Sequence, residues 1–175
     1  MSIKLDLSLS IRIILWIVLL VGGLWLGLRL DRSYFLAFQT PFFRIVSFLL
    51  GVVVFKLSLH AAAVGGRALA KYGRVGNIPR GQTNRLVTED IYSCTRHPML
   101  FGLVLLPLAL ALLMGSPSFI FLIAPIEGVI IALLMIIFDE MESRMKFGKE
   151  FEEYRKKTPI FPRTTKCYKK LFIDS

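Results

Sequence analysis

The stretch that decides the fold is PMLFGLVLLPLALALLMGSPSFIFLIAPIEGVIIALLMIIFDE, residues Pro98–Glu140. It contains two apolar runs, at about 99–114 and 119–138, joined by the uncharged residues GSPS. Because Gly, Ser and Pro together mark a turn, we predict two helices in a tight antiparallel hairpin. The first run is shorter than the roughly 20 residues that a perpendicular membrane span needs. The helix therefore either includes residues 96–98 at its base or stops before the far side of the membrane.

Two further apolar runs precede the hairpin, at about 11–28 and 41–64. The whole chain is 55% hydrophobic and its mean hydropathy is +0.63, well above the values typical of soluble domains. No small-residue cleavage site follows the first run, so we interpret it as a retained span. These features predict an all-α polytopic membrane protein with about four transmembrane helices, forming a single membrane domain over residues 1–175.

Basic residues border the apolar runs and predict the orientation of the chain. The net charge is +10, and the tail over residues 139–175 alone contains ten Lys and Arg. The loop over residues 65–98 contains six, whereas GSPS contains none. The positive-inside rule therefore places the loop, the tail and both termini in the cytoplasm of a multi-pass protein. Since charges beside the membrane already explain the excess of basic residues, we expect no nucleic-acid partner.

Cysteine and histidine usage predicts no metal site. The chain has two histidines and two cysteines, and no Cys/His cluster has metal-ligand spacing. Cys94 and Cys167 both fall on the predicted cytoplasmic side. A disulfide between them is therefore not expected.

Two polar stretches border the hairpin, RLVTEDIYSCTRHPMLFG at Arg85–Gly102 and DEMESRMKFGKEFEEYRKKTPIFP at Asp139–Pro162. Because the hairpin returns the chain to the same membrane face, we predict that the two stretches are neighbours. In the second, polar and aromatic side chains recur at helical spacing, which predicts an amphipathic helix. One face of this helix would contain Glu140, Arg144, Phe147, Phe151 and Tyr154.

Contact with solvent and with anionic headgroups explains most charges of this helix. The i, i+4 pair Glu140–Arg144 would contribute only about 0.2–0.5 kcal/mol to helix stability. Asp139 and Glu140 differ, because carboxylates at the edge of a bilayer gain nothing from anionic lipid. They predict a cationic partner, either an Arg or Lys of the protein or a bound ligand.

Both stretches together resemble the membrane methyltransferases that include isoprenylcysteine carboxyl methyltransferase and phospholipid methyltransferase-like proteins. The signatures of that group are G-x-Y-x-x-x-R-H-P-x-Y-x-G and, after a hairpin, E-E followed by F-G-x-x-Y-x-x-Y and a proline. The residues that occupy the signature positions are Tyr92, Arg96, His97, Pro98 and Gly102 in the first and Asp139, Glu140, Phe147, Gly148, Phe151, Tyr154 and Pro159 in the second. The departures include Asp90 for glycine, Leu100 for tyrosine and Asp139 for glutamate.

The resemblance implies S-adenosylmethionine as cofactor. His97 and Arg96, at the N-terminal end of a helix, suit its carboxylate. Glu140 suits its ammonium through charge-assisted hydrogen bonds. The resemblance also implies that Tyr92, Pro98, Leu100 and Tyr154 complete the binding site, with aromatic faces that attract the sulfonium. By itself, His97 would be interpreted as an interfacial residue that caps a helix.

Methyl transfer mainly requires alignment of the acceptor and exclusion of water. Glu140 and Arg144 are the candidate catalytic residues: Arg144 or Arg96 would position a carboxylate acceptor, and Glu140 would accept a proton from an amine. We expect membrane lipids and a lipophilic acceptor as partners, either a prenylated-cysteine carboxylate or a lipid headgroup. The alternative is a non-catalytic four-span assembly or sensing protein that keeps the fold.

Overall fold

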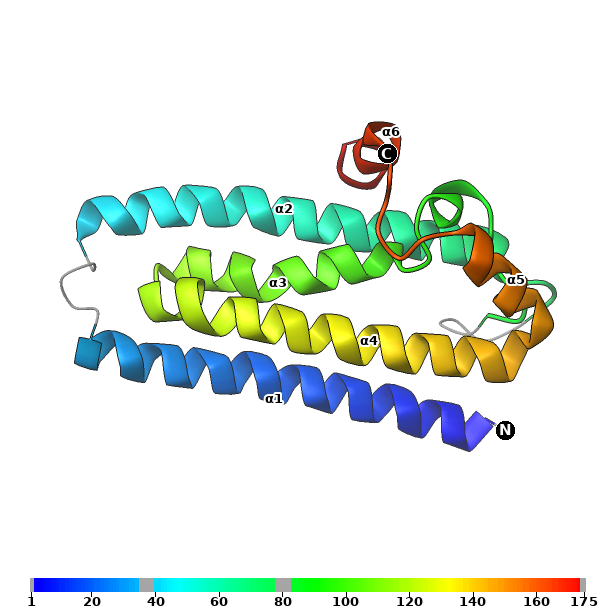
Figure 1. The fold of residues 1–175 in the computed structure, drawn as a ribbon. Coiled ribbons are helices and arrows are strands. Elements are labelled where there is room, and N and C mark those ends of the chain that lie inside the picture. The colour runs from blue at the N-terminus through cyan, green and yellow to red at the C-terminus, as the bar shows by residue number, and fades with distance from the viewer. Residues whose placement is uncertain (1, 35–39, 78–82, 174–175) are drawn as a thin grey trace. The chain divides into compact units, whose positions relative to one another are not determined.

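In the computed structural model all regular elements of the described residues, 2–34, 40–77 and 83–173, are helical (Figure 1). The all-α polytopic fold predicted from the sequence is confirmed. The elements are α1 (Ser2–Tyr34), α2 (Pro41–Tyr72), the 3₁₀ helix η2 (Asp90–Ser93), α3 (Pro98–Met114), the π-helical turn η3 (Phe119–Ile123), α4 (Ala124–Phe147), α5 (Lys149–Lys157) and α6 (Thr165–Phe172).

Three described segments are long and apolar enough to cross a membrane: Ile14–Ser33, Pro41–Tyr72 and Phe119–Phe147. The helices continue beyond the apolar runs expected from the sequence, because backbone hydrogen bonding extends into polar flanks. α3 is apolar but has only 17 residues. At 1.5 Å per residue it is about 25 Å long, less than the roughly 30 Å of a hydrocarbon core.

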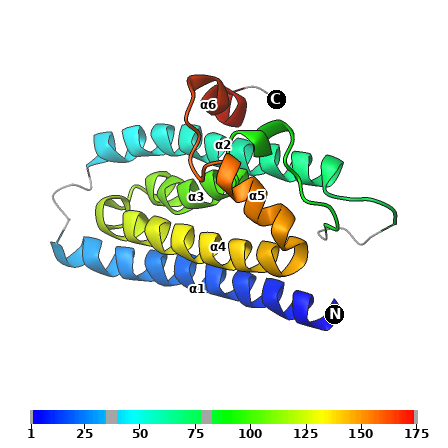
Figure 2. The same cartoon turned by 45° about the vertical axis from the view of Figure 1, so that its right-hand side comes forward.

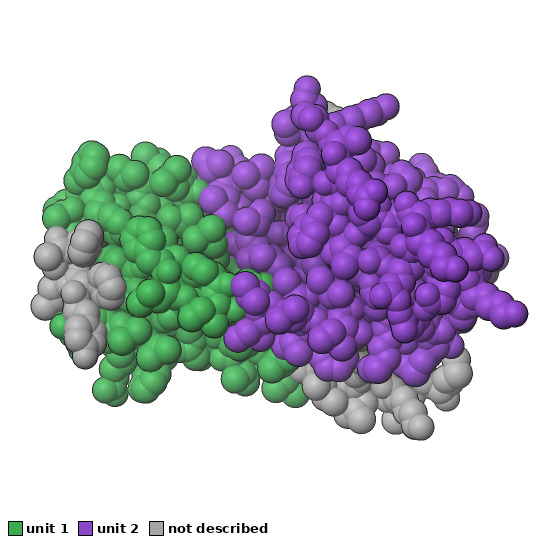
Figure 3. Space-filling model, viewed as in Figure 1, with its two compact units in different colours: residues 1–52, 107–128 green, residues 53–106, 129–175 purple. Residues whose placement is uncertain are grey.

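The chain divides into two compact units, which Figure 3 colours separately. Residues 1–52 and 107–128 form unit 1, and residues 53–106 and 129–175 form unit 2. In unit 1 the GSPS turn is confirmed, since α3 ends at Met114 and Gly115 has φ of +63°. The buried Asp31 carboxylate of α1 accepts a hydrogen bond from the Ser118 N–H at 2.9 Å. α1 thereby stabilises the start of the second arm of the hairpin.

In unit 2, α2 and α3 approach each other closely at Gly102. The Ser58 hydroxyl donates to the Gly102 carbonyl at 2.7 Å. A Cβ atom at Gly102 would lie 2.7 Å from the Ala62 nitrogen, closer than side chains tolerate. The glycine of the first signature is therefore needed for the packing of α3 against α2.

The prediction of a single amphipathic helix after the fourth apolar run is wrong. α4 ends at Phe147, Gly148 takes a backbone conformation with φ of +52° and ψ of −121°, and α5 then leads away in a new direction (Figures 1 and 2). The helical spacing of the side chains does not reveal the break, because the spacing resumes in α5. Phe151 and Tyr154 are buried by the turn, whereas Arg144 remains exposed.

The Gly148→Ala variant is expected to lower the free energy of unfolding by about 1–3 kcal/mol, because only glycine adopts this backbone conformation without strain. A Cβ atom there would meet nothing within 4 Å, so the loss would come from the backbone alone. Thermal unfolding in detergent measures it. The matched control is Gly66→Ala within α2, where a Cβ atom also meets nothing within 4 Å. This substitution should raise the stability, because alanine has a higher helix propensity than glycine. Equal shifts in both variants would contradict the role of the turn.

α6 lies against η2 and is joined covalently to the residue that follows η2. Cys94 and Cys167 form a disulfide with Cα atoms 5.6 Å apart, so the expectation of unpaired cysteines is wrong. That expectation was based on the compartment, whereas the pairing follows from packing: Leu171 is fully buried in a cluster with Ile91 of η2. Lys170 also pairs with Asp90 at the start of η2.

Candidate functional site

The two polar stretches meet in unit 2, which confirms the prediction that they are neighbours. Arg96 Nη1 lies 3.1 Å from Glu140 Oε1. His97 lies between two carboxylates, with Nδ1 at 3.6 Å from Asp139 Oδ2 and Nε2 at 3.7 Å from Glu140 Oε1. The side chains of Arg96, His97 and Glu140 are 8%, 7% and 12% exposed. A largely buried cluster of mixed charge therefore joins the base of α3 to α4.

The backbone around the cluster is held by the segment that follows α5. The Arg96 N–H donates to the Pro159 carbonyl at 3.1 Å. The Thr95 hydroxyl, fully buried, donates to the Ile160 carbonyl and accepts from the His97 N–H. Pro98 begins α3, as its fixed φ and missing N–H predict. Arg96 and His97 are thus fixed in place by main-chain contacts on both sides.

The cluster has unused hydrogen-bonding capacity. Arg96 Nη1 and Glu140 Oε1 are close enough for an ion pair but are not aligned for a hydrogen bond. Among the described residues, these two atoms, Arg96 Nε and His97 Nε2 are buried without a hydrogen-bond partner. Since buried polar groups are nearly always satisfied, donors and an acceptor left together in this way are groups that water or a polar ligand would satisfy.

Tyr92 and Tyr154 flank the cluster and are joined to each other. The Tyr154 hydroxyl donates to the Tyr92 carbonyl at 2.6 Å. Burial raises the pKa of Tyr154 above its ordinary value, and burial followed by the charge of Asp139 does the same for Tyr92. Both phenols therefore stay neutral at physiological pH. Pro98 and Leu100 are also buried, in the first turn of α3.

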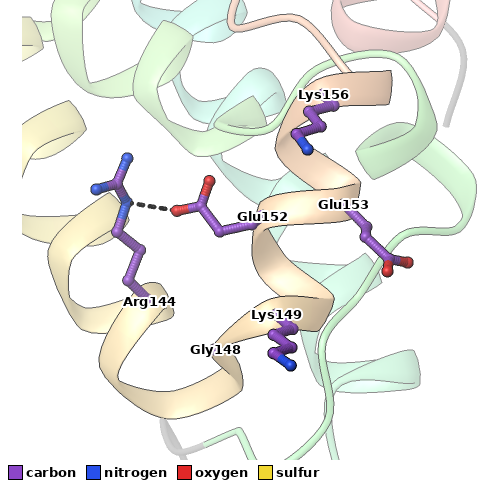
Figure 4. A pocket seen from close by; sticks show the side chains of 6 residues that line it. All are labelled: Arg144, Gly148, Lys149, Glu152, Glu153 and Lys156. Atoms are coloured by element: carbon purple, nitrogen blue, oxygen red, sulfur yellow. Dashed lines mark ion pairs between the residues drawn. The ribbon is translucent and has the colours of Figure 1, made fainter.

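Arg144 does not form the predicted pair with Glu140. Its Nε lies 3.0 Å from Glu152 Oε1, and its side chain is 48% exposed. Both residues line an open hollow of about 440 Å³ at the corner of α4 and α5, where Arg144 points across to Glu152 (Figure 4). The break at Gly148 explains the difference, because it turns α5 out of the line of α4 and places the Glu152 carboxylate within reach of Arg144.

Arg155 takes the place beside Glu140 that was predicted for Arg144. Its Nε lies 3.3 Å from Glu140 Oε2 and its Nη1 lies 3.9 Å from Glu152 Oε2. The charges therefore alternate along Arg96, Glu140, Arg155, Glu152 and Arg144. Arg155 could not be predicted from the sequence, because it lies in a run of basic residues typical of a solvated helix. Its position directly after Tyr154 is the only sequence signal that singles it out.

The Arg155→Gln variant is expected to lower the free energy of unfolding by no more than about 1 kcal/mol, because an ion pair with a partly exposed arginine is weakened by solvent. Thermal unfolding at low and high salt measures this, and the shift should shrink as salt rises. Lys156→Gln, at the next and exposed position, is the matched control and should have no effect. A loss of several kcal/mol in Arg155→Gln would mean that Arg155, not Arg96, carries the pairing of Glu140.

The structure explains the first departure from the signatures. Asp90 adopts φ of +57°, the left-handed region that glycine favours and that aspartate tolerates better than most residues. The turn is therefore kept, with the Lys170 ion pair in addition. Asp139 keeps its carboxylate toward His97. Leu100, which replaces the tyrosine of the signature, is a buried apolar side chain.

Comparison with known proteins agrees with the fold and the site. Residues 46–150, more than half of the chain, match the model of the phospholipid methyltransferase family, and the chain belongs to that family. The matched part includes Arg96, His97, Asp139 and Glu140. Together with the three candidate spans, this membership makes the chain an integral membrane protein. No curated protein and no solved structure matches the chain.

Proposed function

We propose that this protein transfers a methyl group from S-adenosylmethionine to a lipophilic acceptor at the membrane surface. The observation that supports the proposal best is the buried cluster of Arg96, His97 and Glu140, which contains an ion pair and four polar atoms without a hydrogen-bond partner. Membership of a methyltransferase family supplies the reaction class. The cofactor and the acceptor are parts of the proposal.

The residues of the cluster fit the amino-acid end of the cofactor. The carboxylate of the cofactor would accept hydrogen bonds from Arg96 and from His97 Nε2, and its ammonium would donate to Glu140 Oε1. These protein atoms lack a hydrogen-bond partner in the structure. Each new bond would satisfy a protein group that is already buried, so binding adds little desolvation of the protein. When bound, the cofactor supplies an activated methyl group on sulfonium, and the protein has only to align and enclose it.

Neutral aromatic and apolar side chains fit the remainder of the cofactor. Tyr92, Pro98, Leu100 and Tyr154 exclude water around the cluster, and the hydrogen bond from the Tyr154 hydroxyl to the main-chain carbonyl of Tyr92 keeps the Tyr154 ring in place. Because the Tyr154 hydroxyl is already used by the Tyr92 carbonyl, Tyr154 acts through its ring and not as an acid or base.

Two classes of acceptor fit the residues around the cluster. A carboxylate acceptor would be positioned by a cation, and Arg144 is half exposed in a hollow that also contains Lys149 and Lys156. An amine acceptor would instead need a base, for which Glu140 is the candidate. Membership of the phospholipid methyltransferase family favours the lipid headgroup.

The experiment uses the purified protein, S-adenosylmethionine labelled in its methyl group, and membranes that contain both acceptor classes. We expect label in the lipid fraction and none with His97→Ala. A methyl ester on a prenylated cysteine releases its label as methanol in alkali, whereas an N-methyl headgroup keeps it. No transfer to either acceptor by protein that binds the cofactor would favour the non-catalytic assembly or sensing protein.

We infer from the positive-inside rule that the loop, the tail and both termini are cytoplasmic, which would place the site at the cytoplasmic face. The same rule would place the Cys94–Cys167 disulfide on the cytoplasmic face, where disulfides are rare. The charge pattern and the disulfide therefore favour opposite faces, and labelling from outside the cell decides between them. Labelling of a cysteine introduced at Met114, which is exposed at the end of α3 beside the uncharged turn, by an impermeant reagent added to intact cells supports this sidedness. Protection of that cysteine would overturn it.

A further inference from the structure

α6 has a buried face and an exposed face of different chemistry. Leu171 is fully buried, and the Cys94–Cys167 disulfide fixes the helix from the same side. Three apolar or aromatic side chains in or beside the helix are exposed, Phe161 just before it, Tyr168 within it and Ile173 after it, at 58%, 43% and 68%. The Phe161 ring also contacts the edge of Phe101. The exposed cations around them are Arg163, Lys166 and Lys169.

The buried face shows the depth at which α6 lies. Leu171 packs in one cluster with Ala61, Val64 and Ala68 of α2, and α6 lies over this part of α2 in both views (Figures 1 and 2). The same part of α2 carries the exposed residues Arg67 and Lys71 and ends shortly afterwards. Basic residues at the end of an apolar helix mark the boundary between the bilayer core and water. α6 is therefore at the level of the lipid headgroups.

We propose that the exposed face of α6, together with Phe161, is a contact surface for anionic lipid headgroups. Tyrosine is enriched at this level of the bilayer, because its ring is apolar and its hydroxyl is polar. Phe161 and Ile173 enter the upper acyl region, and Lys166 and Lys169 meet the negative surface. The occupant is an anionic bilayer surface, since the cations on this face complement its charge.

The contact is linked to the candidate site through covalent and ionic bonds. Cys94, which holds α6, is two residues before Arg96, and Lys170 of α6 pairs with Asp90 at the start of η2. η2 also carries Tyr92, whose carbonyl binds Tyr154. Lipid contact by α6 therefore stabilises the loop that carries Arg96 and His97. The inference does not depend on methyl transfer and is tested without it.

The test places a single tryptophan on the exposed face. The native tryptophans are Trp16 and Trp25, both in α1, so the reporter is Tyr168→Trp in a Trp16→Phe/Trp25→Phe background. The protein is reconstituted in vesicles of phosphatidylcholine, alone or mixed with phosphatidylglycerol. We expect quenching by lipids brominated high on the acyl chain, little quenching by aqueous iodide, and stronger lipid quenching with phosphatidylglycerol. The Lys166→Gln/Lys169→Gln variant should lose the difference between the two lipids.

Hydrogen exchange of the unmodified protein in the same two lipids gives a second measurement that needs no substitution. The amides of α6 should exchange more slowly when phosphatidylglycerol is present. Full accessibility of the reporter to iodide, or quenching and exchange that are the same in both lipids, would overturn the proposal.

Discussion

The Glu140→Gln variant should bind S-adenosylmethionine at least about 100-fold more weakly than the unmodified protein, and should also unfold more easily. Glu140 is the carboxylate that Arg96, His97 and Arg155 all approach. Removing one member of a buried charge pair leaves its partner uncompensated, which costs about 3–5 kcal/mol of stability. For the bound ligand the loss of a buried charged contact is about 2–5 kcal/mol. Calorimetric titration and thermal unfolding measure the two effects.

Glu150→Gln is the matched control, because Glu150 is exposed in the first turn of α5. It should leave both the affinity and the unfolding temperature unchanged. If Glu140→Gln unfolded normally and bound the cofactor as tightly as the control, Glu140 would be no part of a cofactor site and no partner of Arg96.

Removal of the disulfide is the second change with a large expected effect. In the Cys94→Ser/Cys167→Ser variant the free energy of unfolding should fall by about 2–4 kcal/mol, because the bond closes a loop between residues 73 apart in the sequence. The amides of α6 should also lose protection, since a helix of eight residues has little stability by itself. Unfolding in detergent and hydrogen exchange measure the two results.

A thiol reductant should lower the unfolding temperature of the unmodified protein and leave that of the double serine variant unchanged. The variant is thus the control for side effects of the reductant. Equal unfolding temperatures of the oxidised and reduced protein, with α6 protected in both, would mean that Leu171 and Lys170 hold α6 without the disulfide.

The hairpin and the meeting of the two polar stretches could be predicted from the sequence, because both depend on local signals. An uncharged GSPS turn between apolar runs requires antiparallel arms, and antiparallel arms bring Arg96 and Glu140 to the same end. The start of α3 at Pro98 could be predicted in the same way, because a proline restricts only its own backbone and that of the residue before it.

The parts of the site that could not be predicted depend on a change of chain direction. The spacing of polar and aromatic residues is the same on both sides of Gly148, so nothing in the pattern marks the turn. Once α5 folds back, Arg155 and not Arg144 reaches Glu140. The Cys94–Cys167 pairing was missed for a related reason, because it depends on the burial of Leu171 beside η2 and not on spacing.

Titration calorimetry of S-adenosylmethionine into the unmodified protein in detergent tests the central claim most directly. The cluster of Arg96, His97 and Glu140 predicts saturable binding of one cofactor per chain, which is lost in His97→Ala and in Glu140→Gln. Folded wild-type protein that releases no heat and shows no rise in unfolding temperature with the cofactor would contradict the claim.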